Sequence, residues 1–200
     1  MNPKSWLSRY QNNSIKYLTI MLLFYHGVGI FLLIGGMEII NLFVSDYQEP
    51  DIPHKILPVL LAGPIEETIF FGLPYYLSGN TFVVLGTGIF WTTLHIFNTD
   101  TLDLNYLAYA NWLFVIPSLF FSLRTWISNK GWFSIIVHSA WNIIFFYLGC
   151  FTGELNCDYS IDSSDIMVIF ISIMLMILTY FAMLYRRRKT IEKNLRTGAQ

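Results

Sequence analysis

The chain has 200 residues, of which 54% are hydrophobic and only 12% are charged, and its formal net charge is −1. Soluble domains carry roughly a quarter charged residues, so a water-soluble fold of this size could not cover so much apolar surface. The composition therefore excludes an ordinary soluble domain, and without a net positive charge it gives no sign of a nucleic-acid partner. It predicts an all-α, polytopic transmembrane helical bundle.

Six apolar segments follow one another along the chain and are long enough, or nearly so, to cross a bilayer. A hydrocarbon core of roughly 30 Å needs about 20 apolar residues per helix. The predicted spans are 17–44, 56–77, 82–97, 104–122, 132–151 and 166–185, and the third is the shortest. We expect short turns at 78–80, 98–100 and 128–131. The sequence shows no internal repeat, so we predict one domain over residues 1–200.

Basic residues lie almost entirely on one side of this predicted bundle. With both termini in the cytoplasm, only Lys55 of the 12 Lys and Arg residues falls outside. Such a bias is what the positive-inside rule predicts for six spans. The Arg186–Lys189 cluster then predicts a headgroup anchor after the last span. Cys150 and Cys157 would lie outside, where a disulfide is possible.

Two adjacent carboxylates, Glu66 and Glu67, lie near the middle of the second predicted span. A charged group at this depth costs roughly 2.5–3.5 kcal/mol on insertion scales, so we expect at least one of them to be protonated or hydrogen-bonded. Adjacent helix positions point about 100° apart, so one carboxylate can face a cavity while the other packs against a helix. Pro64 either opens a new helix, which places both carboxylates at a positive dipole end, or only kinks the span.

Three further polar residues can reach the same depth. His95 lies toward the end of the third span, and His138 and Asn142 share one face of the fifth at positions i and i+4. A glutamate can accept a proton from water, a histidine can orient that water, and a second histidine with an amide can stabilise an oxyanion. The sequence therefore predicts one cluster of these residues and the two glutamates, able to hydrolyse a peptide bond.

Other readings of the same residues stay open. Glu66, His95 and His138 could bind a divalent metal such as zinc, because two imidazoles and a carboxylate form a common ligand set, although no His-Glu-x-x-His helix is present. The cluster could also relay protons in a transporter, which the lack of inverted repeats makes less attractive. For His26 in the first span we expect only a structural role, as a buried histidine hydrogen-bonded to a neighbouring helix.

The order of three motifs resembles the CPBP family of intramembrane proteases, also called the ABI or type II CAAX prenyl endopeptidase family. Glu66–Gly72 is similar to its glutamate-pair motif, Phe90–His95 to its aromatic-x-x-x-His motif, and His138–Asn142 to its His-x-x-x-Asn motif. The resemblance covers about residues 56–150, which we take as the catalytic core. Phe71 stands where the family has an arginine, so Glu67 would be neutral or paired with another group such as His26.

The resemblance implies a helical bundle with the motif residues around a cavity that opens toward the membrane. Glu66 would activate water, and His95 would assist it. His138 together with Asn142 would stabilise the oxyanion, and Glu67 would have a supporting role. The implied substrate is a membrane-embedded or lipid-modified, for example prenylated, peptide or protein, and the implied location is the plasma membrane of a prokaryote. The loss of the arginine leaves a second reading, a catalytically degenerate member that acts in bacteriocin self-immunity or as a scaffold.

Overall fold

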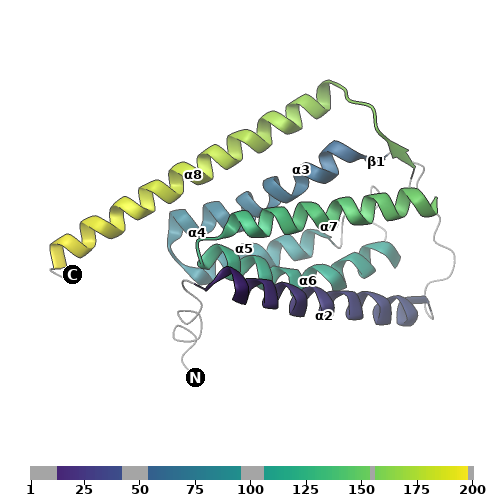
Figure 1. Cartoon of the computed structure of the whole chain (residues 1–200), viewed down its shortest axis with the longest axis horizontal. Coiled ribbons are helices and arrows are strands. Elements are labelled where there is room, and N and C mark those ends of the chain that lie inside the picture. The colour runs from purple at the N-terminus through teal and green to yellow at the C-terminus, as the bar shows by residue number, and fades with distance from the viewer. Residues whose placement is uncertain (1–12, 42–53, 96–105, 154–155, 198–200) are drawn as a thin grey trace. The chain divides into compact units, whose positions relative to one another are not determined.

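The computed structural model describes residues 13–41, 54–95, 106–153 and 156–197, and these are almost entirely helical (Figure 1). The all-α prediction is thereby confirmed. The chain divides into two compact units, one made of residues 1–52 and 85–134 and the other of residues 53–84 and 135–200. Two of the three boundaries fall inside the helices α5 (Thr81–Leu94) and α7 (Gly131–Thr152). The single domain predicted from the sequence stays a prediction.

Each predicted span corresponds to a helical segment. Within the described residues, four helical stretches are long and apolar enough to cross a membrane, namely Ile15–Gly36, Ile56–Ser78, Gly131–Thr152 and Ser163–Arg196. Two shorter apolar helices cover Thr81–Leu94 and Trp112–Ile127. The predicted turn at 98–100 lies outside the described residues. The number of membrane crossings and the orientation of the termini stay predictions.

In the first unit, α2 (Ile15–Asn41) packs against α6 (Tyr106–Ile127). Glycine allows this close approach, because a Cβ at Gly29 would lie only 3.0 Å from the carbonyl oxygen of Phe114. Small residues are how membrane helices bring their backbones together. Near the other end of the pair, Arg124 Nη1 donates a hydrogen bond of 2.6 Å to the Tyr17 hydroxyl.

The second unit is built around a helix that changes type along its length. It begins at the strand β1 (His54–Lys55), runs as α3 (Ile56–Glu67), passes through the π-helical turn η1 (Thr68–Gly72) and ends as α4 (Leu73–Ser78). The helix α8 (Ser163–Thr197) packs against all three helical parts. It extends past the predicted end at 185 because Arg and Lys, which follow the apolar run, are themselves good helix formers.

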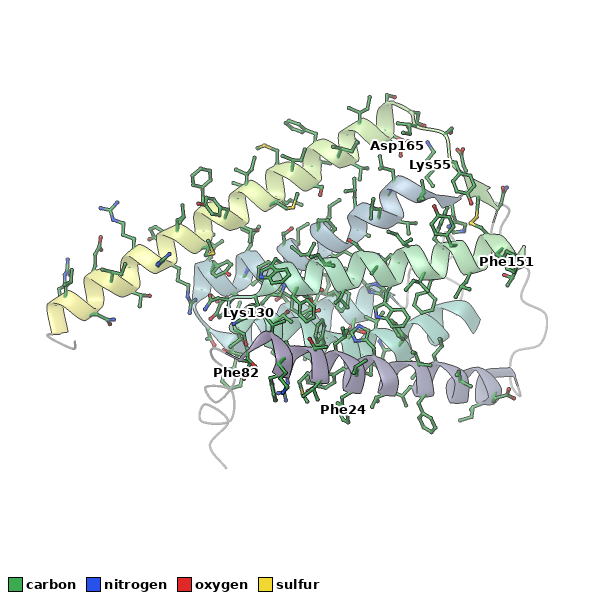
Figure 2. The ribbon with its side chains drawn as sticks, in the orientation of Figure 1. Phe24, Lys55, Phe82, Lys130, Phe151 and Asp165 are labelled. Carbon is green, nitrogen blue, oxygen red and sulfur yellow. A yellow bond between two sulfur atoms is a disulfide. The ribbon has the colours of Figure 1, made fainter. Side chains whose placement is uncertain are left out.

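At one end of this unit, a strand pair and an ion pair tie the start of α8 and the strand before it to the start of α3, and a disulfide ties that strand to the end of α7. The strand β2 (Cys157–Asp158) pairs in parallel with β1. Lys55 Nζ binds the carboxylate of Asp162 and lies 3.4 Å from Oδ2 of Asp165, which is fully buried (Figure 2). A disulfide joins Cys150 to Cys157, as the sequence allowed. We call these three contacts the strand clamp.

At the opposite end of the unit, Arg186 fastens α8 to α4. Its Nη1 donates a hydrogen bond of 2.5 Å to the Tyr75 carbonyl, and its guanidinium carbon lies 4.4 Å from the centre of the Tyr75 ring. Gly79 ends α4 with a φ of +67°. Only glycine adopts this conformation without strain, and a Cβ there would come within 2.8 Å of Arg186. Arg186 therefore has a packing role in addition to its predicted place in a headgroup anchor.

Candidate active site

The two glutamates lie at the end of α3, after a proline that does not interrupt the helix. Pro64 is inside α3, which continues to Glu67. The alternative in which Pro64 opens a new helix, with the carboxylates at its positive end, is therefore wrong. Proline costs an interior helix one backbone donor, and membrane helices tolerate it where neighbouring side chains replace the lost bond. The carbonyl that loses its donor is that of Leu60, four residues before Pro64, whereas the Pro64 carbonyl accepts from both the backbone N–H and, at 2.7 Å, the hydroxyl of Thr68.

The cluster is centred on His138, which α7 places beside the end of α3. Its Nε2 lies 3.7 Å from Oε2 of Glu66, and its Nδ1 lies 3.4 Å from Oε1 of Glu67. One imidazole therefore stands within ion-pair distance of both carboxylates. The fifth predicted span and the second thus bring together three of the five residues singled out in the sequence.

The two carboxylates differ in how much of each the solvent or lipid can reach. The Glu67 side chain is 1% exposed, whereas that of Glu66 is 28% exposed and that of His138 is 14% exposed. A buried carboxylate is tolerated when it is paired and hydrogen-bonded. Glu67 is thus placed to hold His138, while Glu66 keeps an accessible edge on which a water molecule could be activated.

Asn142 lies one helical turn beyond His138 and contacts the backbone of α3. Its Nδ2 donates a hydrogen bond of 3.2 Å to the Val59 carbonyl. An amide nitrogen carries two hydrogens, so this bond uses one of them. The predicted oxyanion role for Asn142 stays a prediction.

Ser139 was not singled out in the sequence, yet its hydroxyl joins α7 to α3. Its hydroxyl donates to the Leu60 carbonyl at 2.9 Å. A serine in the middle of an apolar span carries no distinctive pattern. The signal that could have found it is Pro64, since a proline four residues after Leu60 removes the donor that an α-helix would supply to that carbonyl.

His95 belongs to the first unit, at the end of α5. Its Nδ1 lies 2.9 Å from the carbonyl oxygen of Trp91, and its ring meets the Trp91 ring edge-on at 4.8 Å between centroids. These contacts within one helix fix the orientation of the ring. Its predicted place beside Glu66 joins the two units and stays a prediction.

His26 has the structural surroundings expected for it. It is buried, its Nδ1 lies 3.1 Å from the Leu22 carbonyl oxygen, and its ring packs against the rings of Phe114 and Phe121 on α6. This hydrogen bond joins His26 to its own helix, and the expected bond to a neighbouring helix stays a prediction. The predicted pairing of His26 with Glu67 would join the two units and stays a prediction.

Phe71 occupies the position at which the family motif has an arginine, and it is fully buried. It lies in η1, one turn after Glu67. An apolar ring here cannot neutralise a carboxylate. His138 is the group that approaches Glu67 instead.

The metal site hypothesised from the sequence would need side chains from both units. In the part of the chain that the structure describes, no group of three or more His, Cys, Asp or Glu side chains is arranged to hold a metal ion. The ligand set proposed from the sequence combines Glu66 and His138 of the second unit with His95 of the first. Zinc binding by these three residues stays a prediction.

Comparison with known families supports the motif assignment. Residues 49–144 match the family described as "Type II CAAX prenyl endopeptidase Rce1-like", and this segment contains the motif glutamates, both motif histidines and Asn142. No curated protein and no solved structure matches the chain. The matched family acts in membranes, in agreement with the four membrane-length helices. The resemblance drawn from the three motifs is confirmed, and residues 49–144 are similar to the Rce1-like family of type II CAAX prenyl endopeptidases.

Proposed function

We propose that the chain is an intramembrane endopeptidase of the CPBP type, which hydrolyses a peptide bond in a membrane-embedded or prenylated substrate. The observation that carries the proposal is the position of His138 between two carboxylates of unequal exposure. One donor and one acceptor are enough for a polar contact that only holds two membrane helices together. Two carboxylates and an imidazole exceed this need, and because charged groups in a membrane are costly, their presence indicates a function.

In the proposed reaction, Glu66 accepts a proton from water while the water oxygen bonds to the peptide carbonyl carbon. The resulting oxyanion is stabilised by hydrogen-bond donors, for which the second N–H of Asn142 and the imidazole of His138 are candidates, while His95 assists Glu66 with the water. When the C–N bond breaks, the carbonyl re-forms and the proton passes from Glu66 to the leaving nitrogen. Glu67 holds His138 in place, and His138 in turn orients the Glu66 carboxylate.

A second candidate function rests on Phe71. A buried phenylalanine in place of the family's arginine is the change expected in a member that has lost catalysis and keeps the fold for self-immunity or as a scaffold. In that case the cluster would hold the helices together without turning over substrate. A direct assay separates the two functions.

The test is cleavage of a fluorogenic peptide with a farnesylated CAAX end, added to the full chain in lipid vesicles, with products identified by mass spectrometry. We expect Glu66→Gln to lower the rate by at least about a hundredfold, because a general base contributes typically 10²–10⁴-fold. Glu38→Gln is the matched control, since Glu38 is exposed on α2 and its loss should leave the rate unchanged. Equal rates for wild type and Glu66→Gln would contradict the proposed base, and a wild type that cleaves nothing would favour the non-catalytic function.

A further inference from the structure

The helix that carries both glutamates has an interior defect. Pro64 has no N–H, so the Leu60 carbonyl, four residues earlier, lacks the donor that a regular α-helix would supply. A carbonyl in a lipid environment is costly to leave without a donor. The Ser139 hydroxyl reaches across from α7 and donates to it at 2.9 Å. The donor missing from α3 is thus provided by α7.

The same place is where α3 and α7 come closest. A Cβ added to Gly63 would lie 2.4 Å from the Ser139 hydroxyl oxygen, 2.8 Å from its backbone nitrogen and 3.2 Å from the Ile135 carbonyl oxygen. Only a glycine at position 63 leaves room for this approach. Three residues beyond Gly63 comes Glu66, and one residue before Ser139 comes His138. A contact at this point therefore controls both partners of the cluster.

We propose that Ser139 is a positioning residue for the hydrolytic site. Its hydroxyl donates to the Leu60 carbonyl that Pro64 leaves without its helical donor, and this bond fixes the position of α7 along the axis of α3 and thereby the position of His138 beside the two glutamates. A slip of α7 along α3 by one residue would move His138 by about 1.5 Å along the helix axis. Misplacement by about 1 Å can cost a hundredfold in rate. The effect on catalysis rests on the proposed function, whereas the effect on the position of His138 does not.

The experiment compares three variants of the full chain in detergent micelles or vesicles. Ser139→Ala removes the donor. Pro64→Ala restores an N–H at position 64, so the Leu60 carbonyl regains a donor within its own helix, and the double variant combines the two changes. Ser172→Ala is the matched control, because the Ser172 hydroxyl is also buried in the second unit but has no hydrogen-bond partner among the described residues.

Two readouts separate positioning from activity. The first is the side-chain ¹⁵N NMR signals of His138, assigned by their loss in His138→Gln. The second is the kcat and KM for the farnesylated peptide. We expect Ser139→Ala to shift the His138 signals and to lower kcat about tenfold, which corresponds to about 1.4 kcal/mol, with KM nearly unchanged. Ser172→Ala should change neither quantity.

The decisive comparison is the effect of Ser139→Ala on the His138 signals, measured once with Pro64 present and once in the Pro64→Ala background. In the Pro64→Ala background, Ser139→Ala should leave the His138 signals where Pro64→Ala alone places them. This double variant also serves if Ser139→Ala alone does not fold. The proposal is overturned if Ser139→Ala moves the His138 signals no more than Ser172→Ala does, or if it moves them equally in both backgrounds. A wild type without peptidase activity would refute the proposed function only, since the NMR result would still decide the role of Ser139.

Discussion

Glu66 and Glu67 are neighbours in the chain but have different surroundings. Glu67 is almost completely buried, and Glu66 retains an exposed edge. An isolated buried carboxylate costs several kcal/mol, and this cost is offset only by a partner with good geometry. His138 approaches both groups, so the buried glutamate and the accessible one share one imidazole. The proposed division of roles, with Glu67 holding His138 and Glu66 activating water, rests on this asymmetry.

Phe71 is the residue where this chain departs from the glutamate-pair motif that it resembles, and the burial of Phe71 leads to a prediction about stability. We expect Phe71→Ala to destabilise the protein by about 3–5 kcal/mol, since deleting a buried aromatic ring leaves a cavity. Thermal unfolding in detergent measures the change. Phe31→Ala is the control, because Phe31 is 74% exposed. Equal unfolding temperatures for the two variants would show that the Phe71 ring is not part of the packed interior.

Helices α3 and α8 are held together at both ends by different chemistry. At one end lies the strand clamp, with its strand pair, its disulfide and the Lys55 ion pair. At the other end, Arg186 binds the Tyr75 carbonyl. The hydrogen bond from Lys55 lowers the pKa of Asp162, and the same bond raises the pKa of Lys55. The charged forms of both groups are therefore favoured by folding.

The strand clamp should respond to pH in a defined direction. Because the pKa of Asp162 is lowered on folding, its contribution to stability is complete above its ordinary pKa of about 3.9 and is lost as the pH falls through the folded value. Because the pKa of Lys55 is raised, its contribution is complete below about 10.4 and is lost as the pH rises through the folded value. We expect Lys55→Met to lower the unfolding temperature most between these limits.

The measurement is the unfolding temperature of Lys55→Met relative to wild type at about pH 7 and about pH 3, on either side of the ordinary aspartate pKa. The difference should shrink at the lower pH. Lys130→Met is the control, since among the described residues Lys130 Nζ donates to the Ser128 carbonyl of its own turn and contacts no carboxylate. A difference that stays constant over this range would show that the Lys55 ion pair does not stabilise the folded state.

The sequence predicted the helices and the motif positions because both depend on local pattern. Apolar runs mark the helices, and the i, i+4 spacing of His138 and Asn142 places them on one face. The bond from Ser139 to Leu60 could not be predicted in this way, because it joins residues 79 apart. It depends on the register of α7 against α3. The π-helical turn at Thr68–Gly72 likewise follows from packing rather than from composition.

On the scale of the complete chain, the fold class and the membrane orientation are predicted mainly from the lengths of the apolar segments and the positions of the charged residues. Four described helices reach membrane length, and most basic residues lie near the two chain ends, with Lys55, Arg124 and Lys130 between them. The apolar content predicts insertion into a bilayer. The orientation depends on a small free-energy difference between the two directions of insertion, which the charges flanking the spans determine. For this reason the fold class was predictable, while the orientation needs its own measurement.

Labelling of single cysteines tests the predicted orientation. We expect Asn2→Cys and Gln200→Cys to react with a membrane-impermeant maleimide only after the cells are permeabilised, whereas Ser160→Cys should react in intact cells. The native Cys150 and Cys157 form a disulfide and should give no background. Reaction of either terminal cysteine in intact cells would contradict the prediction of two cytoplasmic termini.

The central claim is that His138 stands between Glu66 and Glu67 within the membrane-embedded part of the protein. The most direct test is an experimental structure of the full chain in a lipid nanodisc, in which the two nitrogen–oxygen separations are measured. The account predicts that both imidazole nitrogens lie close to carboxylate oxygens, as in the 3.7 Å and 3.4 Å separations given above, with His95 directed at the same water-accessible edge of Glu66. A Glu66 side chain that faces the lipid, or a His138 too distant from both carboxylates for a single water to bridge, would contradict it.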